Sequence, residues 1–301
     1  MSPETKSAGR PDTGVIHDIG YRSYQGPRLG RGYATRSLYT QSLRAAFGLG
    51  RSGKSKVVPM LMLGLPVLVA GMLVAFAIMS KLPQLGVDYP AFLAVTGLLV
   101  QIFVAAQAPV LLSRDLRHHT MPLYFSRPIT RQDYVRAKFA AMVSAMMIVM
   151  GLPLLVMFVG SLLAGMDFGH NLGHFLIGLL TALLYALLYS AVALLIAAST
   201  PRRGFGVAAI MGVLVISRIV AQIVFGLSGG FDLHPAESAD WAGLLSPSML
   251  VDSFVTQLFG LADDARAMHA PGTLGLVVFA AEMLVLVVGA YGLTGRRYRK
   301  I

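Results

Sequence analysis

One short segment of this sequence has the residue types and spacing of a phosphate-binding loop. Gly48-Leu49-Gly50-Arg51-Ser52-Gly53-Lys54-Ser55 matches G-x-x-x-x-G-K-S. Such a loop cradles phosphates only between a buried strand and a following soluble helix. Here a basic amphipathic stretch precedes it, and a long apolar run begins at Val57. The segment is therefore predicted to be a flexible basic hinge rather than a nucleotide site.

A second pattern, Leu227-Ser228-Gly229-Gly230, matches the core of a known ATPase signature, although Phe231 follows where Gln is usual. It comes at the end of an apolar run, so we expect a turn there. The chain is predicted to contain no ATPase of its own.

Candidates for metal or acid–base chemistry are sparse. His170 and His174 have i, i+4 spacing, but no third ligand is evident for a metal. His118 and His119 are adjacent and so do not share a helix face. The chain has no cysteine and neither an H-E-x-x-H nor a G-x-S-x-G motif. We therefore predict no catalytic residue and no metal site.

Two charged residues stand inside apolar runs, where a charge costs roughly 2.5 kcal/mol or more. Arg218 and Glu282 lie at matching distances from the same end of two consecutive runs, about 15 Å below that surface. They either form an ion pair between two helices or face a substrate path. Gln101, Gln107 and Gln222 either make hydrogen bonds between helices or line a cavity.

These residues must be positioned by membrane helices. The chain of 301 residues is 55% hydrophobic and only 13% charged, whereas soluble proteins carry about 25% charged residues. A helix needs about 20 apolar residues to cross a bilayer, and its backbone must be satisfied internally. The sequence predicts an all-α polytopic membrane protein with six spans: 57–80, 92–113, 139–163, 172–200, 205–227 and 273–294.

The basic residues fall on alternate connections between these spans. Lys and Arg gather in the N-terminal arm, in the loop 114–138, at Arg202 and Arg203, and in the C-terminal tail, whereas the other loops hold only Lys81 and Arg266. By the positive-inside rule, both termini are expected in the cytoplasm and the protein in the plasma membrane. This distribution accounts for the net charge of +11 without a nucleic-acid partner.

Three regions flank the predicted spans. Residues 1–35 form an irregular arm, and 36–56 an amphipathic helix (36–49) on the inner leaflet followed by the hinge. The remaining chain, 57–301, is the membrane domain. Its acidic outer loop, 228–272, contains a mixed apolar and polar stretch at 247–261. That stretch forms either short interfacial helices or a solvated loop.

The loop 114–138 is the most informative segment. Pro122 suits the first position of a short helix, and Pro128 ends that helix. The helix would expose Leu123, Tyr124 and Phe125, which either dip into lipid or dock into a partner. Thr130 is predicted to be the N-cap of a helix that continues through Asp133 and Tyr134 into the third span.

This loop resembles the first cytoplasmic loop of the permease subunits of type-2 ABC exporters, which have six spans and both ends inside. That loop has an acidic residue, then Gly-Thr, an apolar–acidic stretch, and Ser-Arg-Pro followed by Ser or Thr and Arg. His119 departs from the pattern by replacing the Gly, and Pro122 stands where an acidic residue is common. The matching residues are Asp115, Thr120, Met121, Leu123, Ser126, Arg127, Pro128, Thr130 and Arg131.

The resemblance implies a non-catalytic transport subunit that binds no cofactor itself. The short helix would be a coupling helix that docks into a separate ATPase subunit, with Arg202 and Arg203 as a second contact. Two ATPase subunits, holding ATP and Mg, would work with this chain and a second permease, identical or homologous. The expected docking residues are Asp115, Thr120, Met121, Pro122, Leu123, Tyr124, Phe125, Ser126, Arg127 and Pro128.

Two other classes of protein remain as alternatives. A membrane-embedded enzyme would need a clustered catalytic site, for which no motif is present. A self-contained secondary transporter is usually built from repeated halves, and residues 57–163 and 172–294 show no convincing repeat.

Overall fold

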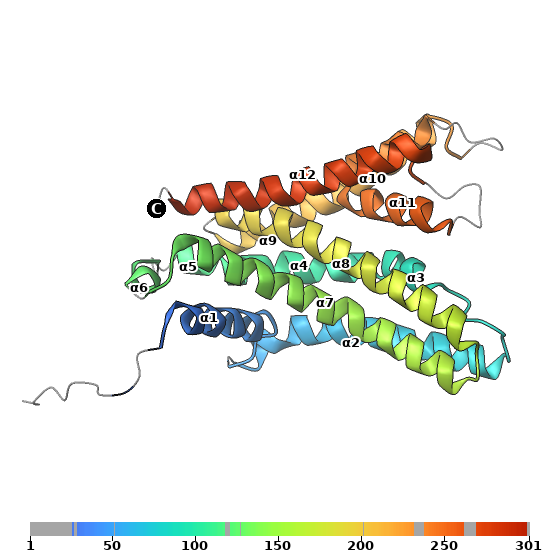
Figure 1. Cartoon of the computed structure of the whole chain (residues 1–301), viewed down its shortest axis with the longest axis horizontal. Helices are drawn as coiled ribbons and strands as arrows, with labels where there is room; N and C mark the ends of the chain where they lie inside the picture. The colour runs from blue at the N-terminus through green and yellow to red at the C-terminus, as the bar shows by residue number, and fades with distance from the viewer. Residues whose placement is uncertain are drawn as a thin grey trace, which may run out of the picture.

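The computed structural model describes residues 26, 29–50, 52–117, 121–126, 128–200, 202–231, 238–261 and 269–299. Every regular element in these ranges is a helix, and together the helices form an elongated bundle (Figure 1). Six segments of the described chain are long and apolar enough to cross a membrane, so the prediction of six spans is confirmed. They are Lys54–Met79, Gly97–Arg117, Arg131–Leu163, Phe168–Ser199, Arg203–Leu227 and Gly272–Tyr298.

Short helices precede, interrupt or follow the spans. At one end of the bundle lie α1, α6 and the last turn of α12, and we call this the α6 end (left in Figure 1). The opposite end is called the far end. In chain order the elements are α1 (Arg31–Ala46), α2 (Lys54–Met79), α3 (Tyr89–Val95), α4 (Gly97–Leu111), α5 (Ser113–Arg117), α6 (Met121–Phe125), α7 (Arg131–Leu163), α8 (Phe168–Ser199), α9 (Arg203–Met211), η1 (Gly212–Ile216), α10 (Ser217–Leu227), η2 (Ala239–Leu245), α11 (Pro247–Phe259) and α12 (Gly272–Arg299).

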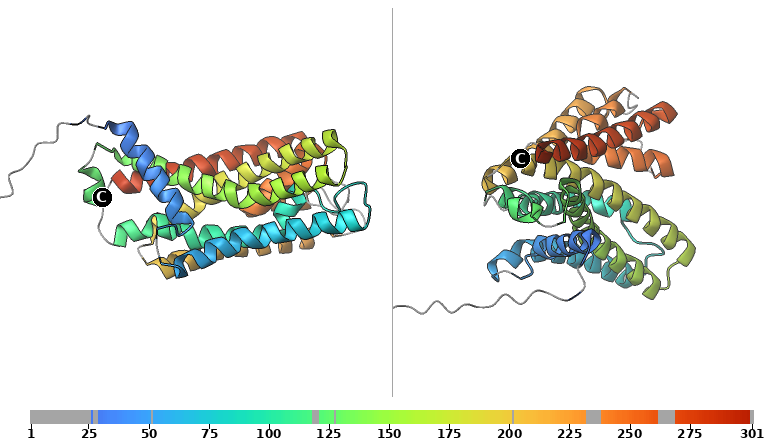
Figure 2. Two further views of the ribbon diagram at one scale, coloured as in Figure 1. Left: turned by 90° about the horizontal axis from the view of Figure 1, so that it is seen from below. Right: turned by 60° about the vertical axis from the view of Figure 1, so that its left-hand side comes forward.

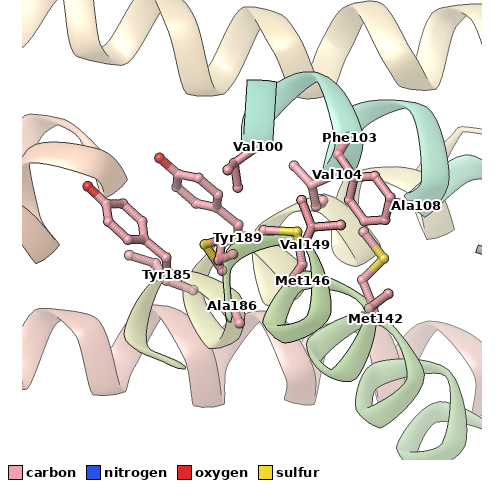
Figure 3. Packing of buried hydrophobic residues seen from close by; sticks show 14 of the residues in the cluster. Val100, Phe103, Val104, Ala108, Met142, Met146, Val149, Tyr185, Ala186 and Tyr189 are labelled. Atoms are coloured by element: carbon pink, nitrogen blue, oxygen red, sulfur yellow. The ribbon is translucent and has the colours of Figure 1, made fainter. Parts of the chain in front are cut away.

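The interior of the bundle is built by α4, α7 and α8. In the most apolar window of the second span 71% of residues are buried inside the protein, against 17% in the fifth span. Methionines of α7, such as Met142 and Met146, pack between Phe103 of α4 and Tyr189 of α8 (Figure 3). The first, fifth and sixth spans therefore form the periphery, where their apolar faces meet lipid or another subunit.

The second span is not the continuous helix that the apolar run 92–113 predicts. It divides into α3 and α4 at Thr96, whose hydroxyl donates to the Phe92 carbonyl at 2.8 Å. A further break precedes α5. The fifth span also departs from regular geometry, because Gly212–Ile216 forms a π-helical segment. Such irregular backbone is tolerated at membrane depth only where protein or water satisfies it.

Helix α1 begins earlier than predicted, at Arg31 rather than Arg36, so the last residues of the arm 1–35 are helical. It does not simply lie on lipid. Leu38, Ser42 and Ala46 are buried, and Figure 2 shows α1 running obliquely across the start of α7. The Tyr39 hydroxyl donates to Ser144 Oγ at 2.9 Å, which fixes the crossing.

The first nucleotide-like pattern begins in the turn after α1 and ends in the first residues of α2, and the second lies at the end of α10. Gly48 lies in the left-handed region at φ +67° in the connection from α1 to α2, and a Cβ there would approach the Ser55 carbonyl oxygen to 2.5 Å. The surrounding elements are helices, as the hinge interpretation requires. Leu227 ends α10, and Gly229 has φ +83° in the following turn.

The outer loop contains helices, as one of its two interpretations predicts, but they are not merely interfacial. Leu250 and Val251 of α11 are buried, and α11 packs against α8, α10 and α12. The short η2 packs chiefly on α10. These two elements therefore insert between the fifth and sixth spans.

We expect Gly160→Ala to destabilise the protein by about 1–3 kcal/mol through overpacking. A Cβ at Gly160 of α7 would approach Val74 Cγ1 of α2 to 2.5 Å. The matched control is Gly151→Ala on the same helix, where the nearest atom is Leu179 Cδ2 at 3.9 Å. The measurement is the thermal unfolding midpoint in detergent. Equal midpoints for the two variants would contradict close packing of α2 on α7.

Candidate functional site

The predicted short helix is present as α6, which begins at Met121, includes Pro122 and ends at Phe125. Leu123 is 69% exposed. Tyr124 and Phe125, expected to be exposed beside it, are instead half-buried, with their rings 5.6 and 6.4 Å from the ring of Tyr134. Leu123 therefore faces outward, whereas Tyr124 and Phe125 anchor the helix to α7.

Tyr134 connects α6 to the membrane domain. Its hydroxyl donates to Asp115 Oδ2 at 2.7 Å, and Lys138 Nζ lies 2.9 Å from the same oxygen. Lys138 is one turn beyond Tyr134 and also sits over its ring, 5.3 Å from the centroid. The side chains of Asp115 and Lys138 are only 14% and 8% exposed. Asp115 thus braces α5 against α7, and its carboxylate points inward.

The start of α7 is closed by a capping box. Thr130 Oγ1 accepts from the Asp133 N–H at 3.3 Å, and Asp133 Oδ2 accepts from the Thr130 N–H at 3.0 Å. This confirms the predicted N-cap at Thr130. Arg31 of α1 reaches the same carboxylate with two bonds, Nε to Oδ2 at 2.6 Å and Nη2 to Oδ1 at 2.9 Å. One acidic side chain therefore joins the loop after α6, the first turn of α7 and α1.

The last turn of α12 also packs against Tyr134. Tyr298 is buried, with its ring 5.3 Å from that of Tyr134. Arg131 stacks over Phe125, 5.7 Å from the ring centroid. We call α5, α6, the first two turns of α7 and the last turn of α12 the coupling region. These elements share contacts that join α6 to three spans.

Sequence reasoning did not single out Tyr134, Lys138 or Tyr298 for this role. A tyrosine followed by a lysine four residues later does indicate one helix face, but nothing in the sequence shows that this face meets Asp115. Tyr298 lies in the basic C-terminal tail, whose composition is typical of a solvent-exposed segment.

Other predicted docking residues have different positions. Ser126 is exposed, and its hydroxyl donates to the Leu123 carbonyl at 2.9 Å. Pro128 is also exposed. Arg202 and Arg203 are exposed at the start of α9, also at the α6 end. Thr120 and Arg127 lie outside the described residues, as do His118 and His119.

The three intramembrane glutamines have different environments. Gln101 is buried and donates from Nε2 to the Tyr189 hydroxyl at 3.2 Å, so it forms the hydrogen bond between helices that was one of its two interpretations. Gln107 is also buried. Gln222 is exposed on α10.

Arg218 and Glu282 do not form the ion pair that was one of their two interpretations. Within the described residues no carboxylate of α12 lies within 4 Å of the Arg218 guanidinium. Counted along the sequence, Arg218 and Glu282 lie at matching distances from the ends of their spans. However, α10 packs on η2 and α11, whereas α12 packs on α8 and α11. The outer-loop helices thus separate the fifth and sixth spans. Glu282 is half-exposed on α12.

Arg218 instead lines a partly open pocket of about 340 Å³ between α3, α8, α10 and α11. Asp252 of α11 lies in the same wall, and its Oδ1 accepts from the Tyr185 hydroxyl at 2.5 Å. Burial raises the pKa of the Asp252 carboxyl to about 6. The pocket also includes Asp88, Thr181 and Thr256. It is a mainly apolar chamber near the far end, and its wall includes charged side chains of both signs.

The histidine pair predicted from spacing does come together. The rings of His170 and His174 are 4.2 Å apart, and His174 Nδ1 lies 3.3 Å from Asp88 Oδ1. Even so, the described part of the chain contains no group of three metal-ligating side chains suited to an ion.

Six apolar helical spans are the architecture of a polytopic membrane protein. A family model described as ABC-2 family transporter protein matches residues 67–232. Because this is more than half of the chain, the protein belongs to the ABC-2 transporter family and is an ABC transporter permease. A search of curated proteins finds no match to the chain.

We expect Lys138→Met to destabilise the protein by about 3 kcal/mol, because it removes the cation that lies 2.9 Å from the buried Asp115 carboxylate. Adding Asp115→Asn should restore most of this loss, because the charge is removed and an oxygen remains to accept from Tyr134. Thermal unfolding midpoints in detergent check this, with the exposed Lys54→Met as control. If the double variant melted no higher than Lys138→Met, the ion pair would not be the source of the effect.

Proposed function

We propose that this permease is the transmembrane subunit of an ATP-driven exporter in which a separate ATPase subunit docks onto α6. The observation that carries the proposal is the geometry of α6. Leu123 projects outward with 69% of its surface exposed, while Tyr124 and Phe125 fasten the helix to Tyr134. An exposed apolar side chain on an anchored helix suits insertion into a groove on a partner.

In this proposal, force passes from the ATPase through the coupling region. ATP and Mg bind between two ATPase subunits, and their closure moves α6. The inward network of Asp115, Tyr134 and Lys138 carries that movement to α5 and α7, and Tyr298 carries it to α12. Asp115 therefore acts as a positioning residue rather than a docking residue. Arg202 and Arg203, exposed at the same end, form the second ATPase contact.

The distribution of Lys and Arg supports a plasma-membrane orientation with the α6 end and both termini in the cytoplasm. Export is the direction that the family resemblance implies. A second permease, identical or homologous, would cover the exposed face of the fifth span. Gln222 is exposed there, and because lipid offers an amide no hydrogen-bond partner, a facing subunit would satisfy it.

The test is purification of the tagged full-length chain from its own cells in mild detergent, with measurement of co-purified ATPase protein and of ATP hydrolysis. Leu123→Asp should reduce both about tenfold or more, since it places a charge in an apolar contact. Leu163→Asp is the matched control, because Leu163 is 82% exposed but ends α7 at the far end.

Two results would count against the proposal. If no ATPase co-purified with the unmodified chain under several gentle conditions, ATP coupling would be rejected. If Leu123→Asp retained as much ATPase as Leu163→Asp, docking would have to occur elsewhere. Changes at Tyr124 or Phe125 are less informative, because they would also disrupt packing on Tyr134.

A further inference from the structure

A second basic feature of the α6 end lies outside the coupling region. An open pocket of about 650 Å³ lies between α1 and the start of α7 and is lined by both helices. We call it the arginine pocket and define it by Arg31, Arg36, Tyr39, Asp133, Arg136 and Ala140, which all line it.

The charges of the arginine pocket do not cancel. Arg31 is neutralised by its two bonds to Asp133. Arg36 and Arg136 are both exposed, and no carboxylate of the described chain forms an ion pair with either. Two guanidinium groups, one from each helix, therefore face an open pocket with an unbalanced charge. Arginine is the side chain best suited to bind phosphate oxygens through paired N–H donors.

The pocket also has a wall suited to lipid. Ala137 and Ala140 of α7 line it beside Tyr39, whose ring is held in place by the hydroxyl bond to Ser144. The sequence of α7 changes here from the charged residues 131–138 to an apolar stretch that begins at Phe139. The pocket therefore carries cations on its polar side and small apolar groups on its membrane side.

The depth of the pocket is that of lipid headgroups. Helix α7 has 33 residues, which at 1.5 Å per residue span about 50 Å, against about 30 Å for the hydrocarbon core. The first turns of α7 must therefore extend beyond the core. The arginine pocket straddles that boundary, where the phosphates of the leaflet at the α6 end lie.

We propose that the arginine pocket binds the phosphate group of an anionic phospholipid, with Arg36 and Arg136 as the phosphate ligands and Tyr39 and Ala140 against its glycerol and upper acyl region. The ion pair between Arg31 and Asp133 forms one wall of the site and holds α1 beside the start of α7. A bound lipid would thereby join α1 to α7 next to the coupling region. The proposal does not depend on ATP coupling.

The test uses the purified full-length complex in a mild non-ionic detergent. Native mass spectrometry counts bound lipid during titration with phosphatidylglycerol or with phosphatidylcholine. Arg36→Gln/Arg136→Gln is compared with Arg44→Gln/Arg296→Gln, which removes the same charge from exposed positions of α1 and α12 outside the pocket. A third titration uses inorganic phosphate, and the thermal midpoint without added lipid checks folding.

We expect the unmodified protein to bind phosphatidylglycerol in preference to phosphatidylcholine. The pocket variant should bind phosphatidylglycerol roughly thirtyfold more weakly, since it loses two arginines near the membrane surface, while the control variant should bind it normally. Equal losses in both variants, or equal binding of the two lipids, would overturn the proposal.

Two other results would also overturn it by assigning a different occupant. If inorganic phosphate prevented phosphatidylglycerol binding at equal concentration, the ligand would be a soluble anion. If the pocket variant lost a co-purifying protein subunit while lipid binding stayed unchanged, the pocket would be a protein contact.

Discussion

The Asp115 carboxylate is the group on which the α6 end depends. It accepts from Tyr134 and pairs with Lys138 in surroundings where both charged side chains are nearly inaccessible. A buried ion is tolerated only when its partners are fully in place, so α5 and α7 can occupy one relative position. Tyr134 in turn supports Tyr124, Phe125 and Tyr298. A five-residue helix with no stability of its own is thereby held in a fixed orientation.

The two ends of the bundle are built on different principles. At the α6 end, ionic and aromatic contacts join short elements to long spans, which suits the transmission of force from a docked partner. At the far end, α11 and η2 insert between spans and create a chamber lined by Arg218 and Asp252. Between them lies the apolar packing of α4, α7 and α8 (Figure 3).

The peripheral spans have a different role. The first, fifth and sixth spans leave most of their side chains unburied, and lipid provides no hydrophobic drive for helices to associate. Close approach at small residues, such as Gly160 against Val74, therefore matters for the first span. The fifth span packs closely at Gly206, where a Cβ would approach Pro109 Cγ of α4 to 3.2 Å, and it carries Gln222 outward. Its π-helical segment at Gly212–Ile216 lies directly before Arg218, which turns into the chamber.

The sequence alone determined the class of the protein, the six spans, the short helix between Met121 and Phe125, and the Thr130 cap. These features depend on hydrophobic runs, proline positions and local hydrogen bonds, which act over a few residues. Only the tertiary structure decided which side of α6 faces outward, because that depends on Tyr134, and that Arg218 shares a pocket with Asp252 and does not pair with Glu282. Depth along a helix can be counted from the sequence, whereas neighbours around its axis depend on how all the helices pack, and here α11 lies between the two spans.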